Sequence, residues 1–105
     1  MPYKSKYHAK KTEIDGIIFD SIKESRRYCE LKLLVRGNVI RDLKLQPVYP
    51  MMVNGKKICT YRGDFEYTEN GVRVCEDVKG MKTPVYRLKR KLFLALYPEI
   101  EHRET

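Results

Sequence analysis

The dipeptide Asn70-Gly71 constrains this chain most, because it separates two runs with strand propensity, 57–68 and 72–79. A two-residue hairpin turn of type I′ needs positive φ at both central positions, and Asn followed by Gly meets that requirement well. Two further pairs, Asp15-Gly16 and Asn54-Gly55, give the same signal. The sequence therefore predicts three tight hairpins, with antiparallel pairing of the strands on either side of each turn.

The turn at Asn70-Gly71 also sets the register of its hairpin. Counting outward from the turn places Asp64 across from Asp77 and Arg62 across from Lys79. Because side chains alternate along a strand, one face of the hairpin is charged and the other is apolar. The charged face is predicted to hold Arg62, Asp64, Glu66, Cys75, Asp77 and Lys79, and the apolar face Phe65, Tyr67, Val74 and Val78. Two carboxylates therefore lie side by side on one face.

A first helix is predicted from its end signals. Ser21 followed by Glu24 has the spacing of a capping box, and Gly37 is a stop signal, which gives a helix over about 21–36. Tyr28 and Leu31 follow Glu24 at helical spacing. Glu24 therefore shares their apolar face, and the helix aims an acid inward.

A second helix begins at Thr83-Pro84, an N-cap followed by the residue favoured at the first helical position, and extends over about 84–97. Segments 39–53 and 100–104 read as extended. The predicted fold class is α/β, a mixed β-sheet flanked by helices.

Length and composition bound what such a fold can do. The chain has 105 residues, the size of one domain, which we place at 12–105 after a flexible basic arm at 1–11. Its net charge of +8 attracts polyanions and favours nucleic acid as the partner. No apolar run approaches the roughly 20 residues that span a bilayer, so no membrane partner is expected. Three widely spaced cysteines indicate reduced thiols and a cytoplasmic protein.

The opposed carboxylates point to a metal. At about 5 Å and an effective dielectric of about 20, the repulsion between Asp64 and Asp77 is about 3 kcal/mol, whereas an exposed salt bridge returns only about 0–1 kcal/mol. A divalent ion between them explains the pair better, and Glu24 adds a third carboxylate. Because His8 and His102 lie at opposite ends of the chain, the metal must rely on carboxylates, which suit Mg²⁺ or Mn²⁺.

This cluster beside a basic surface suits phosphodiester hydrolysis. The segments FDS, LQP, DFEY, EDVKG and LKRK, with the inward Glu24, resemble the PD-(D/E)XK nuclease superfamily and, more closely, a family of small phage and prophage endonuclease-like proteins. The likeness covers about residues 7–104. The superfamily includes restriction enzymes and Holliday-junction resolvases.

The resemblance implies a restriction-endonuclease-like core and a metal-dependent DNA endonuclease. It implies that the metal binds Glu24, Asp64, Asp77 and the carbonyl of Val78, and that Lys79 is the catalytic lysine, so that the catalytic set is Glu24, Asp64, Asp77 and Lys79. Gly63, not Pro, precedes Asp64, which is a departure from the pattern, although the superfamily often lacks that Pro. If the protein is phage-encoded, its location is the cytoplasm of the host cell.

Basic residues near this cluster are candidates for contacts with the DNA backbone. They are Lys82, Arg87, Arg90 and Lys91 around the second helix, and Lys10 and Lys11 in the arm. Because one small domain covers little DNA and cutting two strands needs two sites, a homodimer is expected. Resolution of branched DNA, such as Holliday junctions, is the subclass that the resemblance favours.

Plainer interpretations stay open. Glu24 could serve only the capping box with Ser21, and Glu76 could replace Asp77 as ligand, although alternation places Glu76 on the other face. Asp64, Asp77 and Lys79 could form an ordinary charged ladder, and the basic side of the second helix could be merely solvated. The alternative function is a non-catalytic phage protein that binds DNA or occupies a host nuclease, and RNA is a further candidate substrate.

Overall fold

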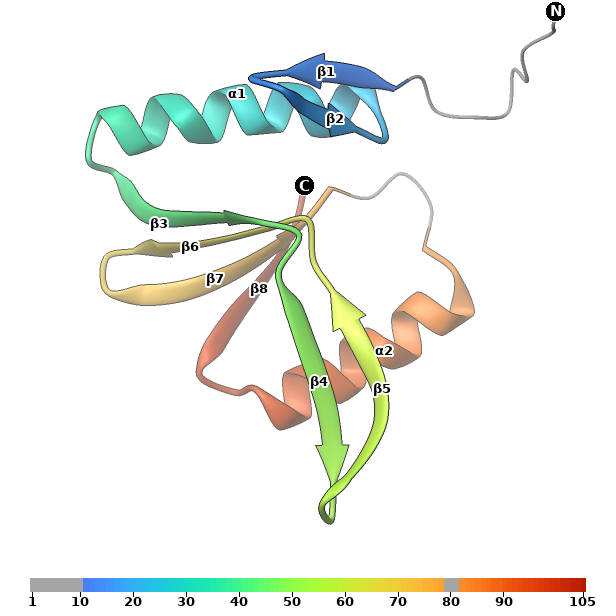
Figure 1. Cartoon of the computed structure of the whole chain (residues 1–105). Helices are drawn as coiled ribbons and strands as arrows, with labels where there is room; N and C mark the ends of the chain where they lie inside the picture. The colour runs from blue at the N-terminus through green and yellow to red at the C-terminus, as the bar shows by residue number, and fades with distance from the viewer. Residues whose placement is uncertain (1–10, 79–81) are drawn as a thin grey trace, which may run out of the picture.

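The computed structural model describes residues 11–78 and 82–105. It is an α/β fold with a mixed four-stranded sheet, two separate hairpins and two helices (Figure 1). The elements are β1 (Thr12–Ile14), β2 (Ile17–Phe19), α1 (Ile22–Arg36), β3 (Ile40–Leu45), β4 (Val48–Val53), β5 (Lys56–Arg62), β6 (Phe65–Glu69), β7 (Val72–Asp77), α2 (Pro84–Leu96) and β8 (Ile100–Glu104). The predicted class is thus confirmed at the level of a mixed sheet with helices.

All three predicted hairpin turns are present. Asp15, Asn54 and Asn70 have φ of 55°, 51° and 53°, and the glycine after each also has positive φ, as a type I′ turn requires. In the hairpin β6–β7, Phe65 lies opposite Glu76 and Glu69 opposite Val72, which is the predicted register. The turn chemistry alone was sufficient to set this pairing.

The predicted strand 57–68 is in fact two strands. β5 ends at Arg62 and pairs with β4, whereas β6 begins at Phe65 and pairs with β3 and β7. Arg62 consequently lies opposite Val48, and its predicted pairing with Lys79 is wrong. The physical reason is a change of strand partner at Gly63: its N–H donates to the carbonyl of Pro47 at 3.0 Å, and the chain passes there from the hairpin β4–β5 into the main sheet.

The last strand makes the sheet mixed. The order is β3-β6-β7-β8, in which β8 runs parallel to β7 and the other two pairings are antiparallel. The two helices begin as predicted, with Ser21 and Thr83 as N-caps whose side chains accept a backbone N–H from Glu24 and Tyr86 at 3.1 Å. Local signals therefore placed both helix starts.

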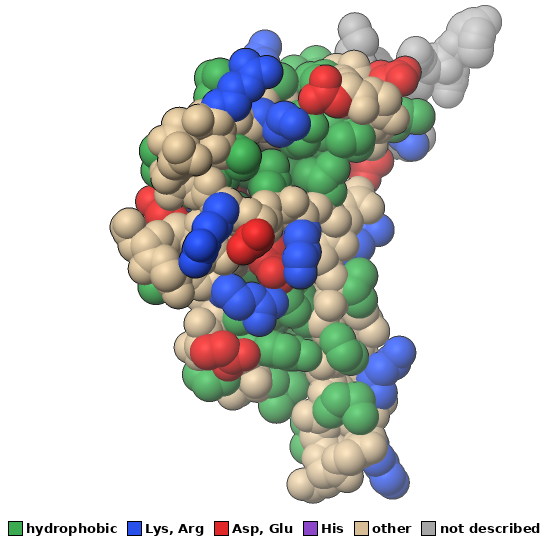
Figure 2. All heavy atoms as spheres, turned by 60° about the vertical axis from the view of Figure 1, so that its left-hand side comes forward, with side chains coloured by type: hydrophobic (Ala, Val, Ile, Leu, Met, Phe, Trp, Pro, Cys, Tyr) green, Lys and Arg blue, Asp and Glu red, His purple; other side chains and the backbone are tan. Residues whose placement is uncertain are grey.

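The surface carries acidic and basic side chains together. Figure 2 shows one face on which lysine and arginine side chains surround acidic ones across the middle, with hydrophobic side chains above and below them. On this face the excess of positive charge is therefore interrupted by acids. None of the described helices is long and apolar enough to cross a membrane.

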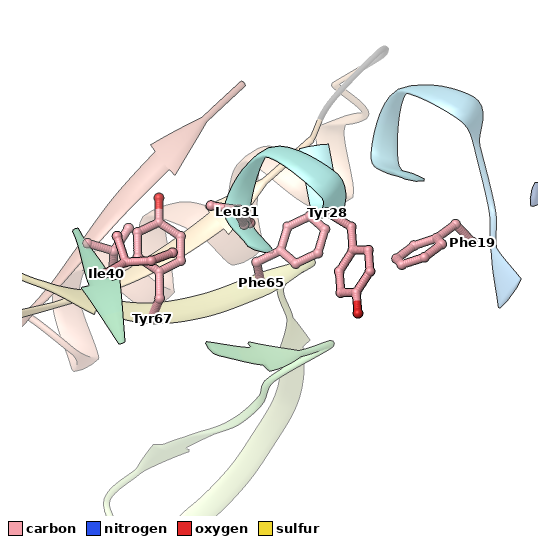
Figure 3. Close-up of a cluster of buried hydrophobic side chains, with 7 residues drawn as sticks. Phe19, Tyr28, Leu31, Ile40, Phe65 and Tyr67 are labelled. Carbon is pink, nitrogen blue, oxygen red and sulfur yellow. The ribbon is translucent and has the colours of Figure 1, made fainter. Parts of the chain in front are cut away.

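The core has two parts, one on each side of the sheet. The first lies between α1 and the sheet and is shown in Figure 3; it consists of Phe19, Tyr28, Leu31, Ile40, Phe65, Tyr67 and Val74. The second lies on the opposite face and consists of Tyr49, Met51, Tyr61, Cys75, Phe93 and Ile100. The face of the β6–β7 hairpin that was predicted to hold charge is thus also a core face. It is covered by α2 and the hairpin β4–β5, and Cys75 packs there.

Candidate functional site

Glu24, near the start of α1, and Asp64, immediately before β6, are neighbouring acids. Glu24 lies in the first turn of the helix and is 8% exposed. Asp64 is the neighbouring acid that acts most strongly on its carboxyl group. Two neighbouring carboxylates repel each other, so the protonated form of one of them is favoured. The predicted inward orientation of Glu24 is borne out, and its side chain is engaged with Asp64 while its backbone N–H serves the cap.

The environment of Glu24 raises its pKa to about 7. Burial is the largest cause, because it penalises the charged form; the charge of Asp64 and the hydrogen bond to it come next, followed by the charge of Asp20. Arg62 acts in the opposite direction. This environment therefore favours the protonated form of Glu24, and a cation bound beside the two acids would favour its carboxylate form.

The backbone around Asp64 is fixed by hydrogen bonds to three segments. Asp64 Oδ2 accepts the N–H of Val78 at 2.7 Å, its own N–H donates to the carbonyl of Glu76 at 3.0 Å, and its carbonyl accepts the N–H of Gln46 at 2.9 Å. Gln46 has a φ of 51°, an uncommon conformation for a residue other than Gly. These contacts hold Asp64 at the point where the two sheets separate.

The glycine at position 63, immediately before Asp64, is explained by close packing. A Cβ at this position would lie 2.6 Å from Cys75 Sγ, closer than atoms can approach. A proline would also lose the N–H that donates to the carbonyl of Pro47. Glycine at this position therefore follows from the local structure.

Asp77 is the last residue of β7 and is fully buried. Its Oδ2 accepts a hydrogen bond from Tyr61 and lies 2.9 Å from His102 Nε2. Its link to Asp64 runs through the backbone, since Asp64 binds the N–H of the next residue, Val78. The structure thus brings Glu24 and Asp64 into side-chain contact and places the backbone after Asp77 against Asp64. Lys79, the predicted catalytic lysine, lies outside the described residues.

The contacts of Asp77 reveal two residues that sequence reasoning did not connect to the site. In the described part of the chain, Cys75, Asp77 and His102 form a set of three possible metal ligands whose ligand atoms lie within 4.8 Å of one another. The prediction that only carboxylates could approach a metal therefore overlooked His102. The parallel pairing of β8 with β7, which places His102 opposite Cys75, is long-range. The one signal in the sequence that could have pointed to His102 was the predicted extended segment 100–104, in which alternate side chains share a face.

Glu76, the alternative to Asp77, occupies a different environment. It is fully buried on the α1 side, where Arg27 Nε lies 2.5 Å and Tyr67 Oη 2.6 Å from its carboxylate. Thr105 donates a further hydrogen bond at 3.0 Å. Burial alone would raise the pKa of Glu76, but the hydrogen bonds from Arg27 and Tyr67 hold it below its usual value. Glu76 is therefore a paired structural acid.

Four of the six predicted DNA contacts gather around one pocket of about 290 Å³ beside the first turns of α2. The pocket is lined by Lys82, Tyr86, Arg87, Arg90, Lys91 and Glu104. Within it, Tyr86 and Lys82 hydrogen-bond to Glu104 at 2.5 and 2.9 Å, which lowers the pKa of Glu104 to about 2. Glu104 is the strand partner of Asp77, so the pocket adjoins the same end of the sheet.

The remaining two predicted DNA contacts lie in the basic arm. Lys11 is exposed immediately before β1, and Lys10 lies outside the described residues.

These features define an α/β domain with a mixed sheet, a helix on each face and a carboxyl pair at one end of the sheet. The chain belongs to the family DUF1064, described as a protein of unknown function, and the match extends over residues 4–104. No curated protein and no solved structure matches the chain significantly.

Proposed function

We propose that this protein is a Mg²⁺- or Mn²⁺-dependent DNA endonuclease that hydrolyses phosphodiester bonds. The observation that carries the proposal is the buried position of Glu24 beside Asp64, whose charge helps to raise the pKa of Glu24, whereas the buried acids Glu66 and Glu76 are each paired with an arginine. A site that must hold a positive charge between two carboxylates is suited to a divalent cation.

The proposed ligands are all oxygen donors, which is the chemistry that such an ion requires. Carboxylate and carbonyl oxygens are the ligands that Mg²⁺ and Mn²⁺ prefer, and Glu24, Asp64 and the carbonyl of Val78 supply them, with Asp77 as the further acid of the proposed set. When bound, the ion would neutralise charge on the phosphate and lower the pKa of a bound water. Glu24 would give up its proton on binding, because the positive charge favours the carboxylate form. Lys79 would orient the attacking water or stabilise the developing charge.

The surroundings of the acids support DNA as the substrate. Arg87 and Lys91 are exposed around the pocket that adjoins the Asp77 end of the sheet, where they would contact phosphates without reading sequence. A mixed sheet with a helix on each face is also what the resemblance to the nuclease superfamily implies. The restriction-endonuclease-like core remains part of the proposal.

Structure-selective cleavage of branched DNA, such as a Holliday junction, is the proposed subclass, and it requires two sites in a homodimer. One domain of 105 residues presents one set of acids, whereas resolving a junction needs two cuts. Mass measurement in solution, with and without junction DNA, tests this step. A strict monomer under both conditions would remove the subclass and leave the single-site nuclease standing.

Cleavage itself is tested with linear duplex, single-strand, flap and four-way junction DNA, and with single-strand RNA, each in Mg²⁺, Mn²⁺ or EDTA. We expect metal-dependent DNA products that disappear in Glu24→Gln, Asp64→Asn and Lys79→Ala. Glu30→Gln is the matched control, because Glu30 is an acid of the same helix whose side chain is 63% exposed.

The two rival interpretations give different outcomes in this assay. If the wild-type chain binds DNA with a strong salt dependence but cuts no substrate in either metal, the protein is a non-catalytic DNA-binding module and the proposal is wrong. If only RNA were cleaved, the proposed metal site would stand and the substrate would be RNA instead of DNA. Under the nuclease proposal, Lys79→Ala leaves DNA affinity and its salt slope nearly unchanged.

A further inference from the structure

Three buried polar groups from three strands meet at Asp77. Tyr61 of β5 donates to Asp77 Oδ2, and His102 Nε2 of β8 lies 2.9 Å from the same oxygen and 2.7 Å from Tyr61 Oη. Tyr61 is 2% exposed, Asp77 0%, and the side chain of His102 1%. In Figure 1 the ends of β7 and β8 and the segment after β5 come together near the C-terminus.

Counting protons assigns the donors in this group. The Tyr61 hydroxyl has one proton, which it donates to Asp77, so His102 Nε2 must carry a proton to make its own two short contacts. His102 Nδ1 is buried and has no hydrogen-bond partner among the described residues, so the polar contacts of the ring are made through Nε2. Both neighbours therefore donate toward Asp77 and fix the orientation of its carboxylate.

The spacing of these atoms indicates a hydrogen-bonded group and argues against a metal cage at the same place. Ligands around a tetrahedral Zn²⁺ with bonds of about 2.0 Å lie about 3.3 Å from each other. The contacts of His102 Nε2 are 2.9 Å to Asp77 and 2.7 Å to Tyr61, which are hydrogen-bond lengths. Cys75, the third member of the ligand set, packs in the second core cluster.

We infer that Tyr61 and His102 are positioning residues that hold the carboxylate of Asp77 ready for the metal of the acid site. The inference rests on the proposed function. Tyr61 lies three residues before Asp64, at the end of β5, so its bond to Asp77 also joins the two segments that carry these acids. Hydrogen bonds that orient a metal ligand typically change metal affinity 10- to 100-fold when removed.

The chain contains a matched control for this role. Tyr49 is the strand partner of Tyr61 in β4–β5, is similarly buried, and donates its hydroxyl to a carboxylate, Glu66, at 2.6 Å. Glu66 is held by Arg73 at 3.0 Å and Lys44 at 3.8 Å, as a structural acid is. Tyr49→Phe therefore makes the same chemical change as Tyr61→Phe without touching an acid of the proposed site.

The experiment measures the Mn²⁺ concentration that gives half-maximal cleavage for the wild-type chain and for Tyr61→Phe, His102→Leu, His102→Gln and Tyr49→Phe. We expect Tyr61→Phe and His102→Leu to raise this concentration about 10-fold or more, with little change in KM for DNA. Tyr49→Phe should stay within about twofold of the wild type. His102→Gln keeps a donor near the position of Nε2 and should recover most of the loss. Thermal unfolding of all four variants separates positioning from general destabilisation.

The outcomes separate this inference from the proposed function. If the wild-type chain cleaves and Tyr61→Phe and His102→Leu behave as Tyr49→Phe does, the positioning role is wrong and the nuclease stands. If the wild-type chain cuts nothing, the proposed function fails and the inference fails with it. Zn²⁺ binding at stoichiometric concentration that is lost in Cys75→Ser would also overturn the inference, because it would assign Asp77 and His102 to a different metal centre.

Discussion

Two pairs of acids in this fold lie in contrasting environments. Glu76 and Glu66 each have an arginine and a tyrosine as partners, and these hydrogen bonds lower their pKa despite burial. Glu24 and Asp64 have each other, and the pKa of Glu24 is raised to about 7. The same residue types are therefore stabilising in one region and mutually repulsive in the other. Acids whose repulsion the fold retains are candidates for binding a cation, since strongly shifted pKa values gather at functional sites.

The largest effect expected from this contrast is on stability, in Glu76→Gln. Removing the charge leaves the partly buried guanidinium of Arg27 beside a neutral group, which costs about 3–5 kcal/mol, with the lower end expected because the Arg27 side chain is 24% exposed. Urea unfolding at pH 7 measures the loss. Glu30→Gln, which removes the exposed partner of Arg27, should cost no more than about 1 kcal/mol. Equal losses in both variants would show that Glu76 is not a structural acid.

Asp64→Asn should have the opposite effect to Glu76→Gln, with a large loss of cleavage and little or no loss of stability. We expect metal-dependent cleavage to fall at least about 100-fold, because a ligand is lost, while the metal-free fold is as stable as the wild type or more stable at pH 8. The measurement pairs initial cleavage rates with unfolding in EDTA. A large loss of stability with unchanged cleavage per folded molecule would place Asp64 in the same class as Glu76.

The pH dependence of stability sharpens the comparison. The pKa of Glu24 rises from 4.5 unfolded to about 7 folded, so its contribution is fully present below pH 4.5 and is lost as the pH rises through 7. Allowing for solvent screening, the wild-type chain in EDTA should lose about 2 kcal/mol between pH 4.5 and 8 relative to Glu24→Gln. Parallel pH curves for the two proteins would refute the raised pKa.

The smallest effects are expected at the DNA surface. Arg87→Ala and Lys91→Ala should each reduce the salt slope of DNA binding by about one, because each removes one phosphate contact. Lys82 and Arg90 are within 4 Å of Glu104, so their removal should change the slope less. Lys56→Ala, at the far end of the β4–β5 hairpin, is the control. If neither Arg87→Ala nor Lys91→Ala changed the salt slope of DNA binding, the DNA would have to bind another face of the protein.

Local signals were sufficient for much of this fold. Asn70-Gly71 set the β6–β7 register, and Ser21 followed by Glu24 placed the start of α1 with its acid inward. The break after Arg62 was not predictable, because it depends on hydrogen bonds from residues distant in sequence, such as the carbonyl of Pro47.

The candidate site also has a part that could be predicted from local signals and a part that could not. The approach of Glu24 to Asp64 was predictable from helix spacing and hairpin register. The approach of His102 to Asp77 was not, because a parallel strand pairing leaves no turn to count from.

Calorimetric titration with Mn²⁺ at pH 7, in two buffers of different ionisation enthalpy, tests the central claim most directly. The account predicts one site whose occupation releases a proton from the Glu24–Asp64 pair, so that the observed heat differs between the buffers, and predicts that both binding and proton release are lost in Glu24→Gln and Asp64→Asn. Absence of Mn²⁺ binding to the wild-type chain, or binding that persists unchanged in both variants, would contradict it.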